Sequence, residues 1–429
     1  MNLSVFKFGG ASVKDASGIK NIGKILELHK GQRVAVVISA MGKSTNALEK
    51  ITDAFFYKKP ELAAYVSEIK NFHKSICSQL FESPTHPIYS NLEADFNEME
   101  DILAQEPTDN WDFEYDQIVS YGEFWATKIV SNYLNEIGVS NTWIDIIDML
   151  KTDNTYREAK VDWETTQKLI RKFMFPIFEK SDDNKHNLVI TQGFTGQTDG
   201  GWATTLGREG SDYTAAILAF CLDAKDVTIW KDVPGVLNAD PKWFSDTVKL
   251  DKISYLDAIE LAYYGASVIH PKTIQPLQNK SIPLYVKSFV NPDEPGTVIN
   301  ADECRLEVPS FIFKINQVLI TISTRDFSFI IEENLRDIFQ LFTDHRVRMN
   351  VMQNSALNLT VSVDYNERTV NKLIKALDKE YKVRFNKGLE LVTIRNYDQA
   401  TIDRVCIDKE ILFEQKSRTT VQLVVKQKE

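Results

Sequence analysis

The segment Thr204–Asp212, followed by the apolar run Tyr213–Leu222, constrains the fold of this chain more than any other feature. Its two glycines flank a cation and an anion, and Ser211 and Asp212 stand where a helix N-cap is expected. A glycine turn that leads into a helix N-terminus directs several backbone N–H groups to one point, which suits an anion. Taken alone, the segment is equally consistent with a plain loop before a buried helix.

A second glycine segment follows directly after the N-terminal apolar residues. Val5–Phe8 is typical of a short strand, and it ends abruptly in Gly9–Ser12. Paired glycines let the backbone approach a ligand closely, and Lys7 lies one residue before the end of the strand. The spacing is neither that of a Walker loop nor that of the dinucleotide-binding fingerprint. By itself, the pair of glycines indicates only a turn.

A third segment combines a strand with a charged turn. Val227–Trp230 is typical of a buried strand, and Pro234–Gly235 predicts a turn soon after it. Asp232, Asp240 and Lys242 surround that turn. The simplest interpretation is a strand and a polar loop.

Together, five motifs in this order resemble those of the aspartate kinases, a family of the amino-acid kinase superfamily. The motifs are Lys7–Val13, Val37–Gly42, Thr205–Asp212, Lys231–Pro241 and Tyr264–Pro271. The resemblance implies a three-layer α/β sandwich with a mainly parallel sheet over residues 1–298, including a mostly helical segment at 55–185. The alternation of strands and helices along the chain favours the same α/β class.

The C-terminal part has a different character. Its strand and helix rhythm over 306–386 resembles an ACT domain, which is an α+β ferredoxin-like regulatory module, and 387–429 resembles a shortened second copy. Between Ile394 and Ile411 there is room for only one short helix. The resemblance implies a homodimer formed through the ACT domains, whereas the pattern alone is equally typical of a generic ferredoxin-like module.

Composition limits the other functions. A net charge of −10 argues against nucleic acid as a partner. No apolar run approaches the ~20 residues needed to cross a membrane, and no signal peptide is evident, so a cytoplasmic location is expected. The four cysteines show neither disulfide nor metal-site spacing, and no side-chain metal site is expected.

The reaction that the resemblance implies is transfer of the γ-phosphoryl group of ATP to the side-chain carboxylate of L-aspartate. That carboxylate is already ionised at pH 7, so no general base is needed. Lys7 would neutralise the γ-phosphoryl oxygens and Asp212 would orient the lysine, while Mg²⁺ would be held by nucleotide and water. The glycines of the loops would supply N–H donors and close approach. The loop residues expected at the nucleotide are Gly9, Gly10, Ser12 and Gly42.

The resemblance assigns further nucleotide contacts to the strand end and loop after 227–230. They are Lys231, Asp232, Asp240 and Lys242. Leu237 occupies the position of an adenine-packing tyrosine, and Ser267 that of a common lysine. We expect these departures to reshape the nucleotide contacts without removing the phosphate cradle.

The expected aspartate-binding residues are Ser39, Thr45, Glu123 and Arg208. Glu123 would pair with the substrate ammonium, although an exposed glutamate at the start of a helix needs no ligand. Trp202 stands where many aspartate kinases have an arginine that clamps a substrate carboxylate. Three explanations stay open: another cation, Lys43 or Arg208, replaces the clamp, aspartate binds weakly, or the acceptor differs.

Two alternatives to an aspartate kinase therefore remain at this point. One is an enzyme of the same superfamily with a different acceptor, and the other is a weakly active paralogue kept as a regulatory subunit. The resemblance also implies lysine or threonine as an effector, bound near Phe327–Asn334. Asn350 stands where relatives often have an aspartate that meets the effector ammonium. Ser355 is kept, and Glu332 or Glu333 could substitute for the missing charge. Weak or absent lysine inhibition is expected.

Overall fold

The computed structural model describes residues 2–180, 187–244, 246–266, 269–302 and 308–428. The chain divides into two compact units, each described here by itself. The first unit consists of Met1–Val236, Lys249–Ile259 and Ile269–Cys304. The second consists of Leu237–Val248, Glu260–Val268 and Arg305–Glu429, so two short segments before residue 298 belong with the C-terminal part.

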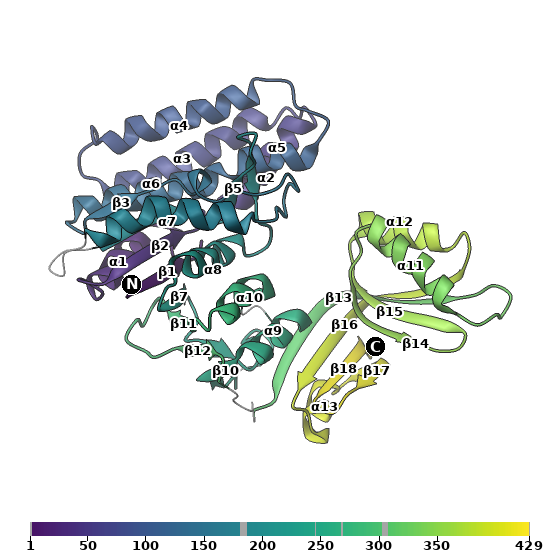
Figure 1. Ribbon diagram of the computed structural model, residues 1–429. Helices are drawn as coiled ribbons and strands as arrows, with labels where there is room; N and C mark the ends of the chain where they lie inside the picture. The colour runs from purple at the N-terminus through teal and green to yellow at the C-terminus, as the bar shows by residue number, and fades with distance from the viewer. Residues whose placement is uncertain (1, 181–186, 245, 267–268, 303–307, 429) are drawn as a thin grey trace. The chain divides into compact units, whose positions relative to one another are not determined.

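An eight-stranded sheet forms the centre of the first unit (Figure 1). Its order is β10-β12-β11-β7-β1-β2-β4-β3, and all neighbours are parallel except β11 and β12. The strands are β1 (Leu3–Phe8), β2 (Arg33–Ile38), β3 (Asn141–Trp143), β4 (Asn187–Gln192), β7 (Asp226–Lys231), β10 (Lys252–Ser254), β11 (Leu284–Ser288) and β12 (Thr297–Asn300). The central strands are buried at almost every position, as expected for a parallel sheet covered on both faces.

The helices of the first unit pack on this sheet and on one another. They are α1 (Ala16–Glu27), α2 (Ser44–Phe56), α3 (Leu62–Leu80), α4 (Pro87–Leu103), α5 (Trp111–Val119), α6 (Tyr121–Glu136), α7 (Trp163–Glu179), α8 (Gly210–Leu222), α9 (Tyr255–Tyr264) and α10 (Pro271–Asn279), with α9 continuing into the second unit. A 3-10 turn spans Ile146–Asp148. Two small ribbons are formed by β5 (Thr195–Gln197) with β6 (Ala203–Thr205), and by β8 (Val236–Leu237) with β9 (Lys249–Leu250).

Helix α8 begins earlier than its sequence predicts. Glu209 is the N-cap with a left-handed backbone (φ 55°), so Ser211 and Asp212 lie in the first turn and the predicted cap positions are wrong. The reason is close packing, because a Cβ on Gly210 would lie 2.6 Å from the ring of Phe194. The helix starts where no side chain fits, and this places Asp212 inside the protein.

The second unit is built on a six-stranded antiparallel sheet of order β14-β15-β13-β16-β18-β17. Its elements are β13 (Ser310–Ser323), α11 (Glu332–Asp344), β14 (Met349–Asn354), β15 (Asn358–Asp364), α12 (Glu367–Leu377), β16 (Lys382–Arg395), α13 (Gln399–Val405), β17 (Lys409–Lys416) and β18 (Thr420–Gln427). One short helix, α13, occupies the space between Ile394 and Ile411, as predicted. Among the described residues, no helix is long and apolar enough to cross a membrane.

Candidate active site

The carboxyl ends of the central parallel strands meet at one edge of the sheet. Strand β1 lies between β7 and β2, and β4 follows β2. In open α/β sheets, ligands bind outside the carboxyl ends of the strands, where the direction of chain progression changes. The loops after these strands carry most of the predicted phosphate-binding and substrate-binding residues.

A buried charge cluster occupies this edge. The Lys7 ammonium lies 2.5 Å from Asp212 Oδ1, and the Lys231 ammonium lies 4.0 Å from Asp212 Oδ2. The Asp212 side chain is only 3% exposed and that of Lys7 11%. Burial opposes ionisation of Asp212, but the two ammonium groups outweigh it, and the pKa of Asp212 lies below its usual value. One carboxylate therefore holds two cations at the ends of β1 and β7.

The two glycine loops support each other. The Gly42 N–H donates to the Gly10 carbonyl oxygen at 3.0 Å, and the Ser39 N–H donates to Phe8 O at 3.1 Å. A Cβ on Gly10 would lie 2.8 Å from the carbonyl oxygen of Ala40, so no other residue fits there without movement. The Gly42 N–H, predicted as a donor to phosphate, is engaged within this loop pair instead.

Glu123 lies inside the protein, in the first turn of α6. It is 3% exposed, so the alternative of an exposed glutamate at the start of a helix is wrong. Burial raises the pKa of Glu123 to about 8, against the lowering effects of the Ala40 N–H, of its own N–H and of Lys7. Among the described residues, Glu123 Oε2 has no hydrogen-bond partner. A buried acid with an open oxygen is suited to a cationic ligand group.

The other predicted aspartate-binding residues lie at loop and helix ends. Ser39 follows β2, and Thr45 lies in the first turn of α2; both are half-buried. Lys43 and Arg208 are exposed. Ser12 is buried in the loop after β1, where its N–H donates to Gly9 O at 2.9 Å.

Asp116 on α5 is a site residue that sequence reasoning missed. It is fully buried, and it accepts hydrogen bonds from the N–H and the hydroxyl of Thr205 at 2.9 and 2.7 Å. It also accepts from the Arg157 N–H at 3.0 Å. Burial raises the pKa of Asp116 to about 6, while these hydrogen bonds lower it. Asp116 thus ties the segment that leads into α8 to the loop around Arg157.

Trp202 directly precedes β6, whose last residue is Thr205. Its side chain is on the surface, 54% exposed, with its ring edge-on to Phe113 at 5.3 Å. The adjoining Ala203 is held to α5 by two hydrogen bonds with Gln117. Tryptophan carries no charge, so the ribbon offers no cation at this position.

The predicted nucleotide residues are divided between the two units. Lys231 ends β7 and the exposed Asp232 follows it, in the first unit. Leu237, Asp240 and Lys242 belong to the second unit, where the Lys242 N–H donates to Asp240 Oδ1 at 2.9 Å. Ser267 lies outside the described residues.

Within the described parts of the chain, no group of three or more histidine, cysteine, aspartate or glutamate side chains is arranged to hold a metal ion. Asp212 is occupied by Lys7 and Lys231.

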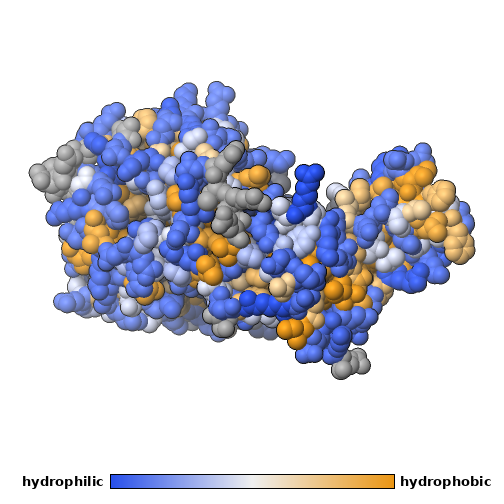
Figure 2. Space-filling view, turned by 90° about the horizontal axis from the view of Figure 1, so that it is seen from below, coloured by the Kyte–Doolittle hydropathy of each residue, from blue (hydrophilic) through white to orange (hydrophobic). Residues whose placement is uncertain are grey.

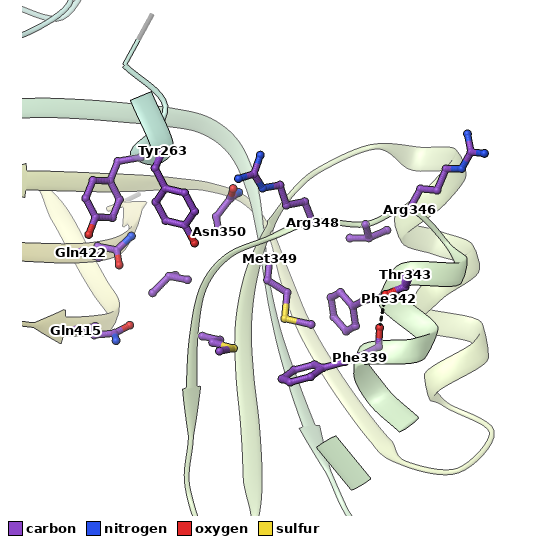
Figure 3. Close-up of a pocket in the computed structure, with 14 residues that line it drawn as sticks. Tyr263, Phe339, Phe342, Thr343, Arg346, Arg348, Met349, Asn350, Gln415 and Gln422 are labelled. Carbon is purple, nitrogen blue, oxygen red and sulfur yellow. Dashed lines mark hydrogen bonds between the residues drawn. The ribbon is translucent and has the colours of Figure 1, made fainter. Parts of the chain in front are cut away.

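The second unit contains a pocket of about 700 Å³ at the edge strand β14 (Figure 3). Tyr263, Arg348, Asn350 and Gln422 are among its lining residues, and the Arg348 guanidinium lies 5.6 Å from the centre of the Tyr263 ring. Asn350 accepts a hydrogen bond from the Lys314 ammonium at 2.7 Å and donates to Gln317 and Asp364. Of the predicted effector residues, Asn350 lines this pocket, whereas Ser355, Glu332 and Glu333 do not.

The fold and this edge of the sheet define a small-molecule kinase. The model of the amino acid kinase family matches residues 2–288. Within that class, the chain belongs to the aspartokinases. It is 28% identical over 425 residues to lysine-sensitive aspartokinase 3 of Escherichia coli (strain K12), covering 95% of this chain and 89% of that protein. It is 30% identical over 417 residues to the chloroplastic aspartokinase 1 of Arabidopsis thaliana, covering 91% and 70%.

Solved structures agree with this assignment. The crystal structure of E. coli aspartokinase III in complex with aspartate and ADP (R-state) superimposes with a TM-score of 0.83 at 26% identity, covering 99% of this chain and 96% of that one. The predicted fold class, a mainly parallel α/β sandwich followed by ACT-like α+β structure, is confirmed.

Proposed function

We propose that this protein is an aspartate kinase that uses MgATP to phosphorylate the β-carboxylate of L-aspartate. The products are β-aspartyl phosphate and ADP, in the first step of lysine, threonine and methionine biosynthesis. The observation that carries the proposal is the cluster of the buried Lys7 and Asp212 with the half-buried Lys231, and the open carboxyl of Glu123 close enough for Lys7 to affect its pKa.

In this reaction an oxygen of the substrate carboxylate attacks the γ-phosphorus, and the bond from that phosphorus to the leaving oxygen of ADP breaks. The nucleophile is already an anion, so the protein has to align two anions and reduce their repulsion. Lys7 and Lys231 supply positive charge to the γ-phosphoryl oxygens. Lys7 lies inside the protein and Lys231 is partly shielded from solvent, so their charge is more effective than it would be in water.

Asp212 has a positioning role in this proposal. Lys7 is buried and Lys231 half-buried, so their ammonium groups repel each other, and a carboxylate between them offsets that repulsion. Asp212 is held in the first turn of α8 by the close packing of Gly210 on Phe194. It therefore fixes both lysines at the end of the sheet before the nucleotide binds.

The nucleotide fits the loop pair for a steric reason. Gly10 packs closely on the neighbouring loop, and a Cβ on Gly9 would lie 3.3 Å from the Lys7 ammonium nitrogen, so the lack of a side chain at Gly9 leaves backbone accessible to a phosphate beside Lys7. We assign phosphate contacts to Gly9, Gly10 and Ser12, and a further nucleotide contact to Asp232, whereas contacts from Leu237 and Lys242 stay predictions from the sequence. When bound, Mg²⁺ would neutralise charge on the β- and γ-phosphates, with phosphate and water as its ligands.

For aspartate, we assign the ammonium to Glu123 and the reacting carboxylate to the region of Lys7, Ser39 and Thr45. Arg208 was expected to contribute a cation. The Arg208 side chain is exposed, so it would contact aspartate only once the substrate has bound. A coupled assay of ADP release with L-aspartate, L-glutamate, carbamate and UMP tests the function: turnover of L-aspartate alone is expected, and preference for another acceptor would reject it.

We also propose that the protein is a homodimer formed through its ACT-like unit. Three large apolar side chains in one loop are exposed: Phe327 by 82%, Phe329 by 67% and Ile331 by 48%. Strand β14 is an edge strand of the described sheet. Figure 2 shows apolar residues at the surface of this unit. Exposed apolar clusters of this kind are typical of protein interfaces.

A cytoplasmic location stays a prediction from the sequence.

Lysine or threonine as an effector is likewise a proposal. Asn350 is neutral, and its amide already interacts with Lys314, Gln317 and Asp364. An incoming ammonium would meet the Lys314 cation near this position. We therefore propose that inhibition by lysine is weak.

A further inference from the structure

The α-carboxylate of aspartate needs a cation, and Trp202 does not supply one. This inference rests on the proposed function. Aspartate carries an ammonium, the reacting β-carboxylate and a second carboxylate that does not react. A site that places the ammonium at Glu123 and the β-carboxylate near Lys7 leaves the second anion without a partner. An unpaired carboxylate in a partly desolvated site is costly, so another side chain has to meet it.

The side chain of Arg157 has the properties of such a partner. Its guanidinium carbon lies 4.8 Å from the centre of the Trp111 ring and 4.8 Å from the centre of the Tyr115 ring. One nitrogen lies 3.3 Å from Asp112, and the side chain is 42% exposed. Contact with two aromatic faces limits the freedom of the guanidinium while leaving further N–H donors of its fork for a ligand.

The backbone of Arg157 is fixed to the segment that leads into α8. Its N–H donates to Asp116, which also binds Thr205 through two hydrogen bonds. A Cβ on Gly207 would lie 3.0 Å from the Arg157 carbonyl oxygen, so the two chain segments are in close contact. Arg157 itself has a left-handed backbone, with φ 71°. Only a few per cent of non-glycine residues adopt this conformation, so these contacts hold the arginine in an uncommon one.

Tyr115 lies on α5, the helix that precedes α6 and Glu123. The tyrosine is 8% exposed and its ring contacts the guanidinium. Burial raises the pKa of Tyr115 to about 12. Glu49, Asp116 and Glu123 also raise this pKa, whereas Arg157 lowers it. Arg157 therefore lies against the helix that directly precedes the one carrying Glu123. Glu123 and Arg157 supply the opposite charges that a substrate ammonium and carboxylate need.

We propose that Arg157 binds the α-carboxylate of L-aspartate through its guanidinium, and so determines specificity for an acceptor that carries this group. Lys43 and Arg208, the two cations expected from the sequence, are both exposed, and no aromatic contact orients either of them within the described structure. Arg157 is the better oriented cation before substrate arrives. Arg157 supplies the positive charge that Trp202 lacks.

The test uses two variants of Arg157 and one matched control. Arg157→Gly removes the guanidinium and suits the left-handed backbone, since glycine adopts positive φ freely. Arg157→Lys keeps a charge without the planar fork. The control is Lys58→Gly, because Lys58 also has a positive φ (51°) and forms an ion pair with Glu106.

Each protein is assayed with L-aspartate and with its α-amide, which keeps the ammonium and the β-carboxylate but lacks the α-charge. Arg157→Gly should raise the KM for L-aspartate roughly ten- to hundredfold, as expected for one charge-assisted contact, and leave the KM for MgATP unchanged. It should also lose most of the wild-type preference for aspartate over the α-amide. The KM of Arg157→Lys for L-aspartate should lie between those of the wild type and Arg157→Gly, and the KM of Lys58→Gly should match that of the wild type.

The inference is overturned if Arg157→Gly leaves the KM for aspartate unchanged, or raises the KM for both acceptors equally, as a structural role would. Failure of the proposed function can be told apart from failure of this inference, because the wild type would then phosphorylate neither L-aspartate nor its α-amide.

Discussion

The buried carboxyl of Glu123 predicts a specific pH dependence. Its pKa of about 8 means that only roughly a tenth of the free enzyme carries the anion at pH 7, and about three quarters at pH 8.5. If only the anion binds the substrate ammonium, the apparent affinity for L-aspartate is proportional to the fraction of Glu123 that is ionised. The KM for L-aspartate should therefore fall roughly eightfold from pH 7 to pH 8.5.

The substitution Glu123→Gln separates this effect from other titrations. Glutamine has nearly the shape of the neutral acid and cannot ionise. The variant should have a higher KM for aspartate at pH 8.5, with little remaining dependence on pH, and an unchanged KM for MgATP. Initial rates at saturating MgATP, measured from pH 6.5 to 8.5, give the comparison. The same fall in KM with pH in wild type and variant would refute the assigned role.

The same pKa predicts an opposite trend in stability. A carboxyl whose pKa is raised on folding holds its proton in the native state and loses it in the unfolded state between about pH 4.5 and pH 8. Unfolding then releases a proton, so its contribution to stability is present at low pH and declines as the pH rises through this interval. Without substrate, Glu123→Gln should match the wild-type Tm near pH 5 and exceed it at pH 8.5. A lower Tm for the variant at pH 8.5 would contradict the burial argument.

Three further substitutions or titrations test the rest of the site. Lys7→Ala should lower kcat by roughly 10²–10³ with smaller changes in either KM, because it removes charge that acts mainly in the transition state; wild-type kcat in a folded variant would rule this role out. Gly10→Ala should weaken MgATP binding and lower the Tm, since its Cβ would lie 2.8 Å from the Ala40 carbonyl oxygen, and a variant with unchanged Tm and KM would show that the loops yield easily. Lysine titrated into the assay should inhibit weakly, and half-inhibition at sub-millimolar lysine would contradict the proposal drawn from Asn350.

The parts of the site that depend on local pattern were predictable from the sequence. Strands β1, β2, β4 and β7 are short apolar runs, and parallel strands with glycines at their carboxyl ends place their loops at one edge. The resemblance to the aspartate kinases, rather than the local pattern, predicts Lys7 and Asp212 in one site, and the structure brings them within 2.5 Å. Their roles in catalysis stay proposals.

Other features depend on contacts between distant residues. The start of α8 was misplaced because the packing of Gly210 on Phe194 decides it, and no capping pattern records that contact. Asp116 was missed because it joins Thr205, 89 residues away, and Arg157, 41 residues away. The burial of Glu123 was likewise not evident, since a glutamate in the first turn of a helix is ordinarily exposed.

The central claim is transfer of phosphate from ATP to the β-carboxylate of L-aspartate, and trapping the acyl phosphate tests it most directly. Purified protein is incubated with MgATP, L-aspartate and hydroxylamine, which converts β-aspartyl phosphate to the β-hydroxamate, and the product is identified by mass spectrometry. We predict β-aspartyl hydroxamate in an amount equal to the ADP released, and almost none with Lys7→Ala. Release of ADP without hydroxamate, or with the hydroxamate of another acid in its place, would contradict the account.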